Sequence, residues 1–150
     1  MTTKEYLCSV KRLDNMINDK LDEIYRVKTR ATNITVPCDK ERVDGTPCID
    51  RMGEQVTDIV EMEKDVDLLT DFLVDIKKNI VRMCATLNPS QANVVIKHYV
   101  ECNSFSQTAD ICGFKIGKTK KLCREAEIEL EKQYGNAICR YTLDSNRYIW

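Results

Sequence analysis

Apolar residues recur every three or four positions along two long stretches of this chain, which is the period of an amphipathic helix. The first stretch covers residues 3–30, and its apolar stripe consists of Leu7, Val10, Leu13, Ile17, Leu21, Ile24 and Val27. The second covers residues 51–87 and resembles a coiled-coil seam, with Glu63 as the one acid on it. Two such stripes can bury each other in an antiparallel hairpin, or bury the same stripes in a second copy of the chain. The pattern therefore predicts a long helical hairpin and leaves a homodimer open.

Residues 31–50, between the two stretches, break this period. They contain Pro37, Gly45 and Pro47 together with charges of both signs, which predicts an irregular connector. A connector of this length is unusual in a compact domain, where long loops are either functional or mobile. The pattern does not decide between these two roles.

Shorter helices are expected after the long stretch. Asn88 and Pro89 end it and start a helix over about 89–102, because proline is tolerated at the first helical position and asparagine is a common cap. The expected inner face of this helix consists of Ala92, Val95, Ile96, Tyr99 and Cys102. Ser104 and Gln107 have the spacing of a capping box, which predicts a short helix that begins at Phe105.

A glycine is expected to end each of the last two helices. Gly113 suits the left-handed position after the short helix, and Gly135 is expected to stop a longer helix over about 115–134. The inner positions of that longer helix are Thr119, Leu122, Ala126 and Leu130. The aromatic tail that follows is aperiodic, and we expect it to pack on the body as a strap.

The elements together predict an all-α protein. Residues 1–87 form a helical hairpin with its connector, residues 88–134 a helix-turn-helix, and residues 135–150 a C-terminal tail. No run of residues approaches the length of a membrane span, and the N-terminus has no apolar signal core. We therefore expect a cytoplasmic protein without membrane contact.

Charge is distributed unevenly, although the formal net charge is only −1. Residues 54–75 hold eight acids and one base, whereas residues 114–124 hold five bases and no acid. Such an asymmetry predicts two surfaces with different partners. The basic segment coincides with the start of the last helix.

In a helix-turn-helix the second helix enters the major groove of DNA, so the basic segment is the candidate DNA-binding surface. At about 100° per residue, Lys120, Lys121 and Arg124 lie opposite the apolar positions, together with Gly117. Lys115 and Lys118 lie near the helix N-terminus, where the helix dipole favours phosphate. The second half of the helix is acidic and would be repelled by DNA, through Glu125, Glu127, Glu129 and Glu131. The predicted contacts to double-stranded DNA are therefore made by Lys115, Lys118, Lys120, Lys121 and Arg124.

A family resemblance is visible at these residues. Residues 109–114, followed by Lys120, Lys121, Leu122 and Ala126, resemble the helix-turn-helix of sigma factor region 4. The order of elements up to about Tyr134 is more similar to phage late-gene regulators of the ArpU and RinA type. The matching pieces are residues 4–7, 13–14, 17, 42–45 and 50–52, the long acidic helix, residues 98–101 and the helix-turn-helix. The resemblance implies a transcriptional regulator of phage or prophage genes in a bacterial host cell.

Other chemistry finds little support in the residues. The chain has no catalytic arrangement of His, Ser, Cys or Asp at usable spacing and no glycine-rich phosphate loop, so we expect no enzyme and no cofactor. The eight cysteines include no Cys-x-x-Cys pair, and His98 is the only histidine, which favours reduced thiols without a metal. The alternative to DNA binding is a coiled-coil adaptor that docks on a protein partner such as RNA polymerase.

Overall fold

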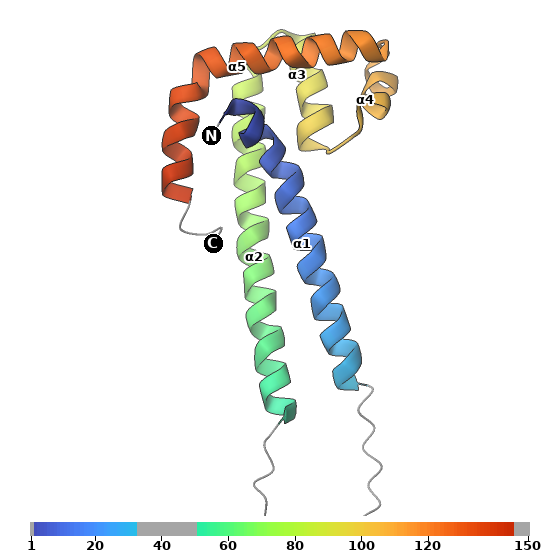
Figure 1. The fold of residues 1–150 in the computed structure, drawn as a ribbon, viewed down its shortest axis with the longest axis vertical. Coiled ribbons are helices and arrows are strands. Elements are labelled where there is room, and N and C mark those ends of the chain that lie inside the picture. Colours follow the sequence, from blue (N-terminus) through green and yellow to red (C-terminus); the bar gives the residue numbers. More distant parts are fainter. Residues whose placement is uncertain (1, 33–50, 146–150) are drawn as a thin grey trace, which may run out of the picture. The chain divides into compact units, whose positions relative to one another are not determined.

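The computed structural model describes residues 2–32 and 51–145, and every element in these ranges is helical. The elements are α1 (Thr3–Thr32), α2 (Arg51–Cys84), α3 (Pro89–Val95), the short π-helix η1 (Ile96–Val100), α4 (Phe105–Cys112) and α5 (Ile116–Ser145), as Figure 1 shows. The expected all-α fold, with two long helices that pack together before a helix-turn-helix, is confirmed. Most of the predicted connector, residues 33–50, lies outside the described residues. None of the described helices combines the length and apolarity that crossing a membrane requires.

The contacts divide the chain into two compact units. One lies within Met1–Asp14 and Phe72–Trp150, and the other within Asn15–Asp71. The start of α1 and the end of α2 therefore belong with the C-terminal helices, across the division at residue 88 that the sequence suggested. This placement matters for function, because the helix-turn-helix rests on the same core as the N-terminus.

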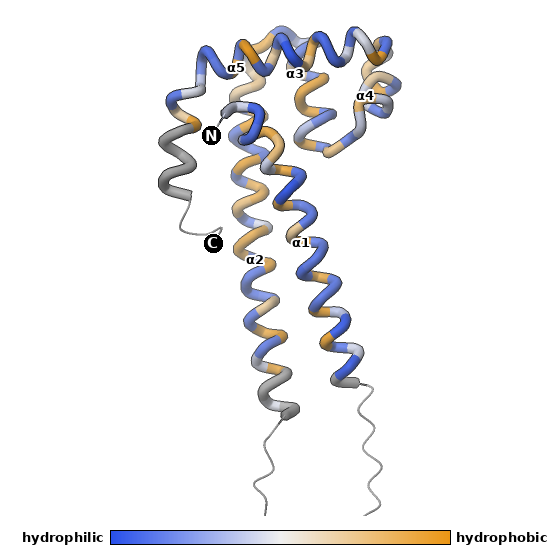
Figure 2. The backbone as a smooth tube through the Cα atoms, in the orientation of Figure 1, coloured by the Kyte–Doolittle hydropathy of each residue, from blue (hydrophilic) through white to orange (hydrophobic). Residues whose placement is uncertain are grey.

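The long helices α1, α2 and α5 and the short elements between α2 and α5 contribute buried apolar side chains to the first unit. They are Tyr6, Leu7, Val10 and Leu13 from α1, Leu73, Ile76, Ile80, Met83 and Cys84 from α2, then Leu87, Val94, Val95, Tyr99, Ala109, Cys123, Ala126, Leu130 and Ile138. Full burial of one such aliphatic side chain contributes roughly 1.5–3 kcal/mol. Figure 2 shows apolar residues in orange alternating with polar residues in blue along the helices. The seam predicted for α2 is thus confirmed over its last four turns.

Among the described residues of the second unit, Ile24 is the buried apolar side chain. Two ion pairs join α1 to α2 there, Lys20–Asp65 at 2.8 Å and Lys28–Glu63 at 2.6 Å. Glu63, the acid on the predicted seam, therefore lies at the edge with a partner and stays about half exposed. Such exposed pairs contribute only about 0–1 kcal/mol.

Two positions of the predicted stripes are wrong, Leu21 in the first and Val56, which the period of three and four residues places on the seam of the second. Leu21 of α1 is 47% exposed and Val56 of α2 is 56% exposed. Both lie in the second unit, where only a narrow strip of each helix is covered. A pattern that repeats along the sequence does not reveal where the partner helix stops covering it.

The helix ends also differ from expectation. α2 ends at Cys84, three residues early, and the Leu87 amide donates to the Cys84 carbonyl oxygen in a tight turn (3.1 Å). Asn88 then adopts an extended backbone, as expected before Pro89, but its side chain makes no capping hydrogen bond. The start of α3 therefore depends on Pro89 rather than on an asparagine cap.

Gly135 does not stop the last helix. α5 continues through it to Ser145, so the predicted end at residue 134 is wrong, as is the aperiodic strap for residues 135–145. A glycine inside a helix costs about 1 kcal/mol, and the burial of Ile138 one turn later offsets that cost. Residues 146–150, with the last two aromatic residues, lie outside the described residues.

The helix expected over 89–102 ends early and in a different form. It changes at Ile96 to the wider π-helix, in which the Glu101 amide donates to the Ile96 carbonyl oxygen at 3.1 Å. η1 ends at Val100, and Cys102, two residues later, has a φ of 57°, which is left-handed and unusual for a residue with a side chain. Val95 and Tyr99 are buried as expected, and so are Gln91 and Val94, which the pattern did not single out.

Candidate nucleic-acid interface

The first helix of the helix-turn-helix, α4, has the predicted capping box at its start. The Gln107 amide donates to the Ser104 hydroxyl (3.3 Å), and the Ser104 amide donates to Gln107 Oε1 (2.9 Å). Two amides that a helix end leaves without partners are thereby satisfied. Thr108 and Ala109 are the buried residues of this short helix.

The turn between α4 and α5 is a left-handed glycine turn. Gly113 has φ 67° and ψ 30°, which an L-residue with a side chain adopts only at a cost. The Phe114 amide donates to the Ala109 carbonyl oxygen (2.9 Å), and the Gly113 amide to that of Asp110 (3.4 Å), which is a Schellman motif. The predicted role of Gly113 is confirmed, and the motif fixes where α5 begins relative to α4.

The buried side of α5 consists of residues at helical spacing. Thr119, Cys123, Ala126 and Leu130 are almost completely buried, whereas Leu122 is only half-buried. Leu122, expected inside, is therefore wrong, and Cys123 occupies a core position that the apolar pattern did not single out. Cysteine is a small apolar side chain here, and burial raises the pKa of its thiol to about 12.

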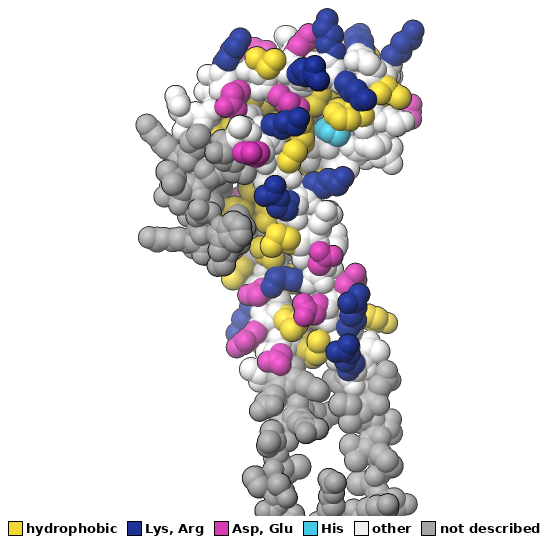
Figure 3. All heavy atoms as spheres, viewed as in Figure 1, with side chains coloured by type: hydrophobic (Ala, Val, Ile, Leu, Met, Phe, Trp, Pro, Cys, Tyr) yellow, Lys and Arg dark blue, Asp and Glu magenta, His cyan; other side chains and the backbone are white. Residues whose placement is uncertain are grey.

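The five predicted DNA contacts all lie in the first turns of α5 or just before it, and all are exposed: Lys115, Lys118, Lys120, Lys121 and Arg124. Figure 3 shows Lys and Arg side chains gathered at the end of α5 that adjoins α4. Lys121 is the one with a carboxylate near it, Glu125 Oε1 at 3.9 Å, which is a weak and exposed contact. We call these five residues the basic surface.

Two aromatic rings, Phe114 and Phe105, support this surface, and neither was predicted to do so. Lys118 Nζ lies 4.5 Å from the centre of the Phe114 ring, and Lys120 Nζ lies 5.8 Å from that of Phe105. Cations over aromatic faces gain about 0.5–1 kcal/mol at exposed sites. The spacing of four residues from Phe114 to Lys118 was visible in the sequence, whereas the Phe105–Lys120 contact crosses the turn and was not.

His98 forms the next layer beneath Phe105. The two rings stack with centroids 3.9 Å apart, and His98 also meets Tyr99 edge-on at 4.7 Å. His98 Nδ1 donates to the Asn103 carbonyl oxygen (2.8 Å), and burial lowers the pKa of the imidazole. A hydrogen-bonded histidine ring that packs against Phe105 and Tyr99 has a structural role.

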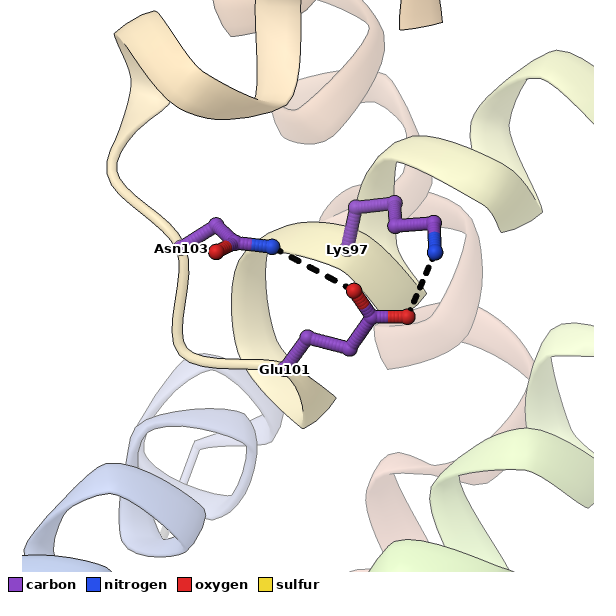
Figure 4. A network of polar contacts seen from close by, with 3 residues as sticks. All are labelled: Lys97, Glu101 and Asn103. Carbon is purple, nitrogen blue, oxygen red and sulfur yellow. Dashed lines mark hydrogen bonds and ion pairs between the residues drawn. The ribbon is translucent and has the colours of Figure 1, made fainter. Parts of the chain in front are cut away.

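The loop that leads into α4 is fixed by a second set of polar contacts. Glu101 accepts from Lys97 Nζ (2.6 Å) and from Asn103 Nδ2 (3.3 Å), as Figure 4 shows. The Asn103 amide also donates to the Lys97 carbonyl oxygen (3.3 Å). These bonds join η1 to the segment just before Ser104, so the π-helix positions the start of the helix-turn-helix.

Two of the four acids at positions 125–131 of α5 have structural partners. Tyr99 Oη donates to Glu127 Oε1 (2.6 Å), and the Cys123 thiol lies 3.4 Å from the same oxygen. Glu131 Oε2 accepts from the backbone amide of Thr3 (2.7 Å). The acidic segment of the helix is thus used in part to hold α1 and η1.

Comparison of the chain with protein-family models, with curated proteins and with solved structures finds no match to any of them. The resemblance to phage regulators therefore remains an expectation that depends on the residues quoted above.

The described residues offer little support for a metal site or a small-molecule site. No group of three or more His, Cys, Asp or Glu side chains there could hold a metal ion. A hollow beside Ile128 is lined by side chains of α5 alone, namely Glu125, Ile128, Glu129, Lys132 and Gln133. It is open and formed by one helix, whereas small-molecule sites bury most of their ligand.

Proposed function

We propose that this protein binds double-stranded DNA through α4 and α5 and regulates transcription, in the manner of the phage and prophage regulators that its motifs resemble. The observation that carries the proposal is the basic surface, five exposed cations on a segment of eleven residues that has no acid. This segment starts the second helix of a capped helix-turn-helix. In that motif the first residues of the second helix contact the bases.

The geometry of α5 supports contact with a duplex. Thr119, Cys123 and Ala126 are turned into the core, so the cations occupy the side that is free to meet a ligand. Neutralisation of phosphates by lysine and arginine supplies most of the affinity of such surfaces, because counterions are released. Arg124 and Lys121 are also able to donate to the acceptor atoms of guanine in the major groove.

The test is a triple variant of the full chain, Lys120→Ala, Lys121→Ala and Arg124→Ala. Its binding to a labelled mixed-sequence DNA duplex at low salt should fall by at least about 100-fold, since each lost charge contact costs roughly 1 kcal/mol or more. Helical content and melting temperature should stay close to those of the parent, because the three side chains are exposed.

A matched control removes the same charge elsewhere in the same unit. The control variant removes three cations from α2, through Lys77→Ala, Lys78→Ala and Arg82→Ala. It should lose only the long-range attraction to DNA, because salt screens charges that are more than about 10 Å apart. Equal loss of DNA binding in the two triple variants would mean that net charge matters and the basic surface does not. A parent protein that binds no duplex even at low salt would overturn the proposal.

One observation favours an adaptor as the second candidate. Ile111 and Ile116, on either side of the turn, are 54% and 47% exposed. Exposed apolar side chains are common at protein interfaces, and a partner such as RNA polymerase could bury this pair. Changing both residues to Ser should leave DNA binding nearly intact and abolish polymerase binding if the adaptor function is correct. The triple variant of the basic surface should show the reverse pattern if DNA is the ligand.

A further inference from the structure

Three glycines lie in the helix-turn-helix and the last helix, and the chain itself accounts for two of them. Gly113 has a left-handed φ of 67°. At Gly135 an added Cβ would come within 3.2 Å of Glu131 Oε1, the carboxylate that also accepts from the Thr3 amide. Gly117 has neither reason, because its φ is not left-handed and no atom lies within 4 Å of an added Cβ.

Gly117 is therefore a helical glycine that the fold does not require. It lies in the first turn of α5 and is exposed. Glycine is the poorest helix former after proline, and alanine at such a position is better because glycine loses more backbone freedom on folding. Open space and a helical backbone would accept almost any side chain.

The neighbours of Gly117 on the helix surface indicate what the missing side chain leaves room for. Lys121 and Arg124 follow it by four and seven residues, so the three positions lie on one side of α5. That side is opposite the buried Thr119, Cys123 and Ala126. Position 117, which has no side chain, is thus next to two exposed cations, on the side of α5 that faces away from the core.

We propose that Gly117 is the point at which DNA comes closest to the backbone of α5. This inference rests on the proposed DNA binding and deepens it. A residue without Cβ lets the helix backbone approach the ligand directly, which is a known use of glycine at binding surfaces. The long side chains of Lys121 and Arg124 then reach the duplex on either side of that contact, and any side chain at 117 holds the helix away from it.

The experiment measures stability and DNA binding separately in full-length variants. Gly117→Ala should raise the melting temperature by about 2 °C, because alanine is the better helix former. Gly117→Leu should keep a melting temperature at least equal to that of the parent. Affinity for a labelled mixed-sequence duplex should fall in the order Gly, Ala, Leu, with a loss of about tenfold or more for Leu, which corresponds to ~1.4 kcal/mol. Stability and binding therefore change in opposite directions, which a purely structural glycine would not produce.

Asn136→Leu is the matched control, since it adds the same side chain to another exposed position of α5. It should leave the affinity unchanged. If Gly117→Leu binds the duplex as tightly as the parent, the inference is overturned while DNA binding by the basic surface stands. If Asn136→Leu weakens binding as much as Gly117→Leu, the effect is not specific to position 117 and the inference is likewise overturned. If the parent binds no duplex at all, the proposed function itself is wrong, which is a different result.

Discussion

The backbone amide of Thr3 donates a hydrogen bond to Glu131 Oε2 at 2.7 Å, across 128 residues of sequence. The bond caps the first turn of α1 with a carboxylate from α5, the helix that carries the basic surface. Thr2 and Glu5 add a local capping box, in which the Thr2 amide donates to Glu5 Oε2 (2.8 Å) and the Glu5 amide to Thr2 Oγ1 (3.3 Å). Two carboxylates thus lie at the positive end of the α1 dipole, where negative charge is stabilising.

Acid should weaken this link. Hydrogen bonding by Thr3 holds the pKa of the Glu131 carboxyl below its usual range. A carboxyl with a lowered pKa stabilises the folded state at neutral pH, and that contribution is lost as the pH falls through the folded-state pKa. Glu131→Gln should therefore melt at a lower temperature than the parent at pH 7, and the difference should disappear as the pH falls through the lowered pKa of Glu131, because the parent carboxyl then becomes protonated as well.

The natural comparison is Glu129→Gln, two residues away on the same helix and without such a bond. It should leave the melting temperature unchanged across the same pH range. A constant difference between parent and Glu131→Gln at every pH would show that the charge of Glu131 has no role. Because Glu127 also has a structural partner, Glu125 and Glu129 are the better acids to neutralise in tests of DNA binding.

Tyr99 should contribute to stability through its hydroxyl. It is 7% exposed and donates to Glu127 Oε1 at 2.6 Å, and burial together with this bond raises the pKa of the phenol. Tyr99→Phe removes the donor and leaves the carboxylate without it, which should cost about 1–2 kcal/mol in the free energy of unfolding. Urea titration followed by circular dichroism measures the loss.

Tyr25→Phe provides the reference for that experiment. Tyr25 is 72% exposed, so removal of its hydroxyl should change the free energy of unfolding by less than about 0.5 kcal/mol. Equal effects at the two tyrosines would contradict a structural role for the Tyr99–Glu127 bond. Such a result would also remove the reason to treat Glu127 as part of the support for α5.

Much of the fold could be predicted because local chemistry determines it. The apolar period predicted α1 and α2. The Ser104–Gln107 pair predicted the capped helix and Gly113 predicted the left-handed turn, since these residues act on the backbone next to them. The errors have a different origin. The helix does not end at Gly135, and Leu21 is exposed, because both outcomes depend on which side chains other segments bury. The sequence of one helix does not contain that information.

The candidate site divides in the same way. The cations of the basic surface were visible as a run of like charge, and helical periodicity placed Lys120, Lys121 and Arg124 away from the core. The supporting contacts were not visible, because Phe105 under Lys120 and Thr3 on Glu131 join segments that are far apart in sequence. Periodicity identifies the exposed side of a helix but not the residues that hold the helix in position.

The thiols should react in an order set by burial. Cys8 is exposed, whereas Cys84 and Cys123 are buried, and burial raises the pKa of their thiols to about 11 and about 12. The thiolate is the reactive form, so N-ethylmaleimide at neutral pH should label Cys8 quickly and the two buried thiols only after unfolding. Mass spectrometry of peptides gives the rates, and a similar rate at all three sites would contradict the burial of Cys84 and Cys123.

All eight cysteines should be reduced thiols. Denatured, unreduced protein should titrate for all eight thiols, and a count lower by four would show two disulfides.

The dependence of DNA binding on salt tests the basic surface as a whole. If all five cations meet phosphates, the logarithm of the association constant should fall with the logarithm of salt concentration with a slope of about −4 to −5 per chain, since each contact contributes ~0.9. Lys118→Ala should reduce the magnitude of this slope by about one contact, because Lys118 is held over the Phe114 ring at 4.5 Å and is exposed. Lys132→Ala removes an exposed lysine farther along α5 and should leave the slope unchanged. Fluorescence anisotropy over a salt series gives both numbers. A slope close to zero for the parent, or the same decrease in both variants, would mean that the first turns of α5 do not contact the phosphates.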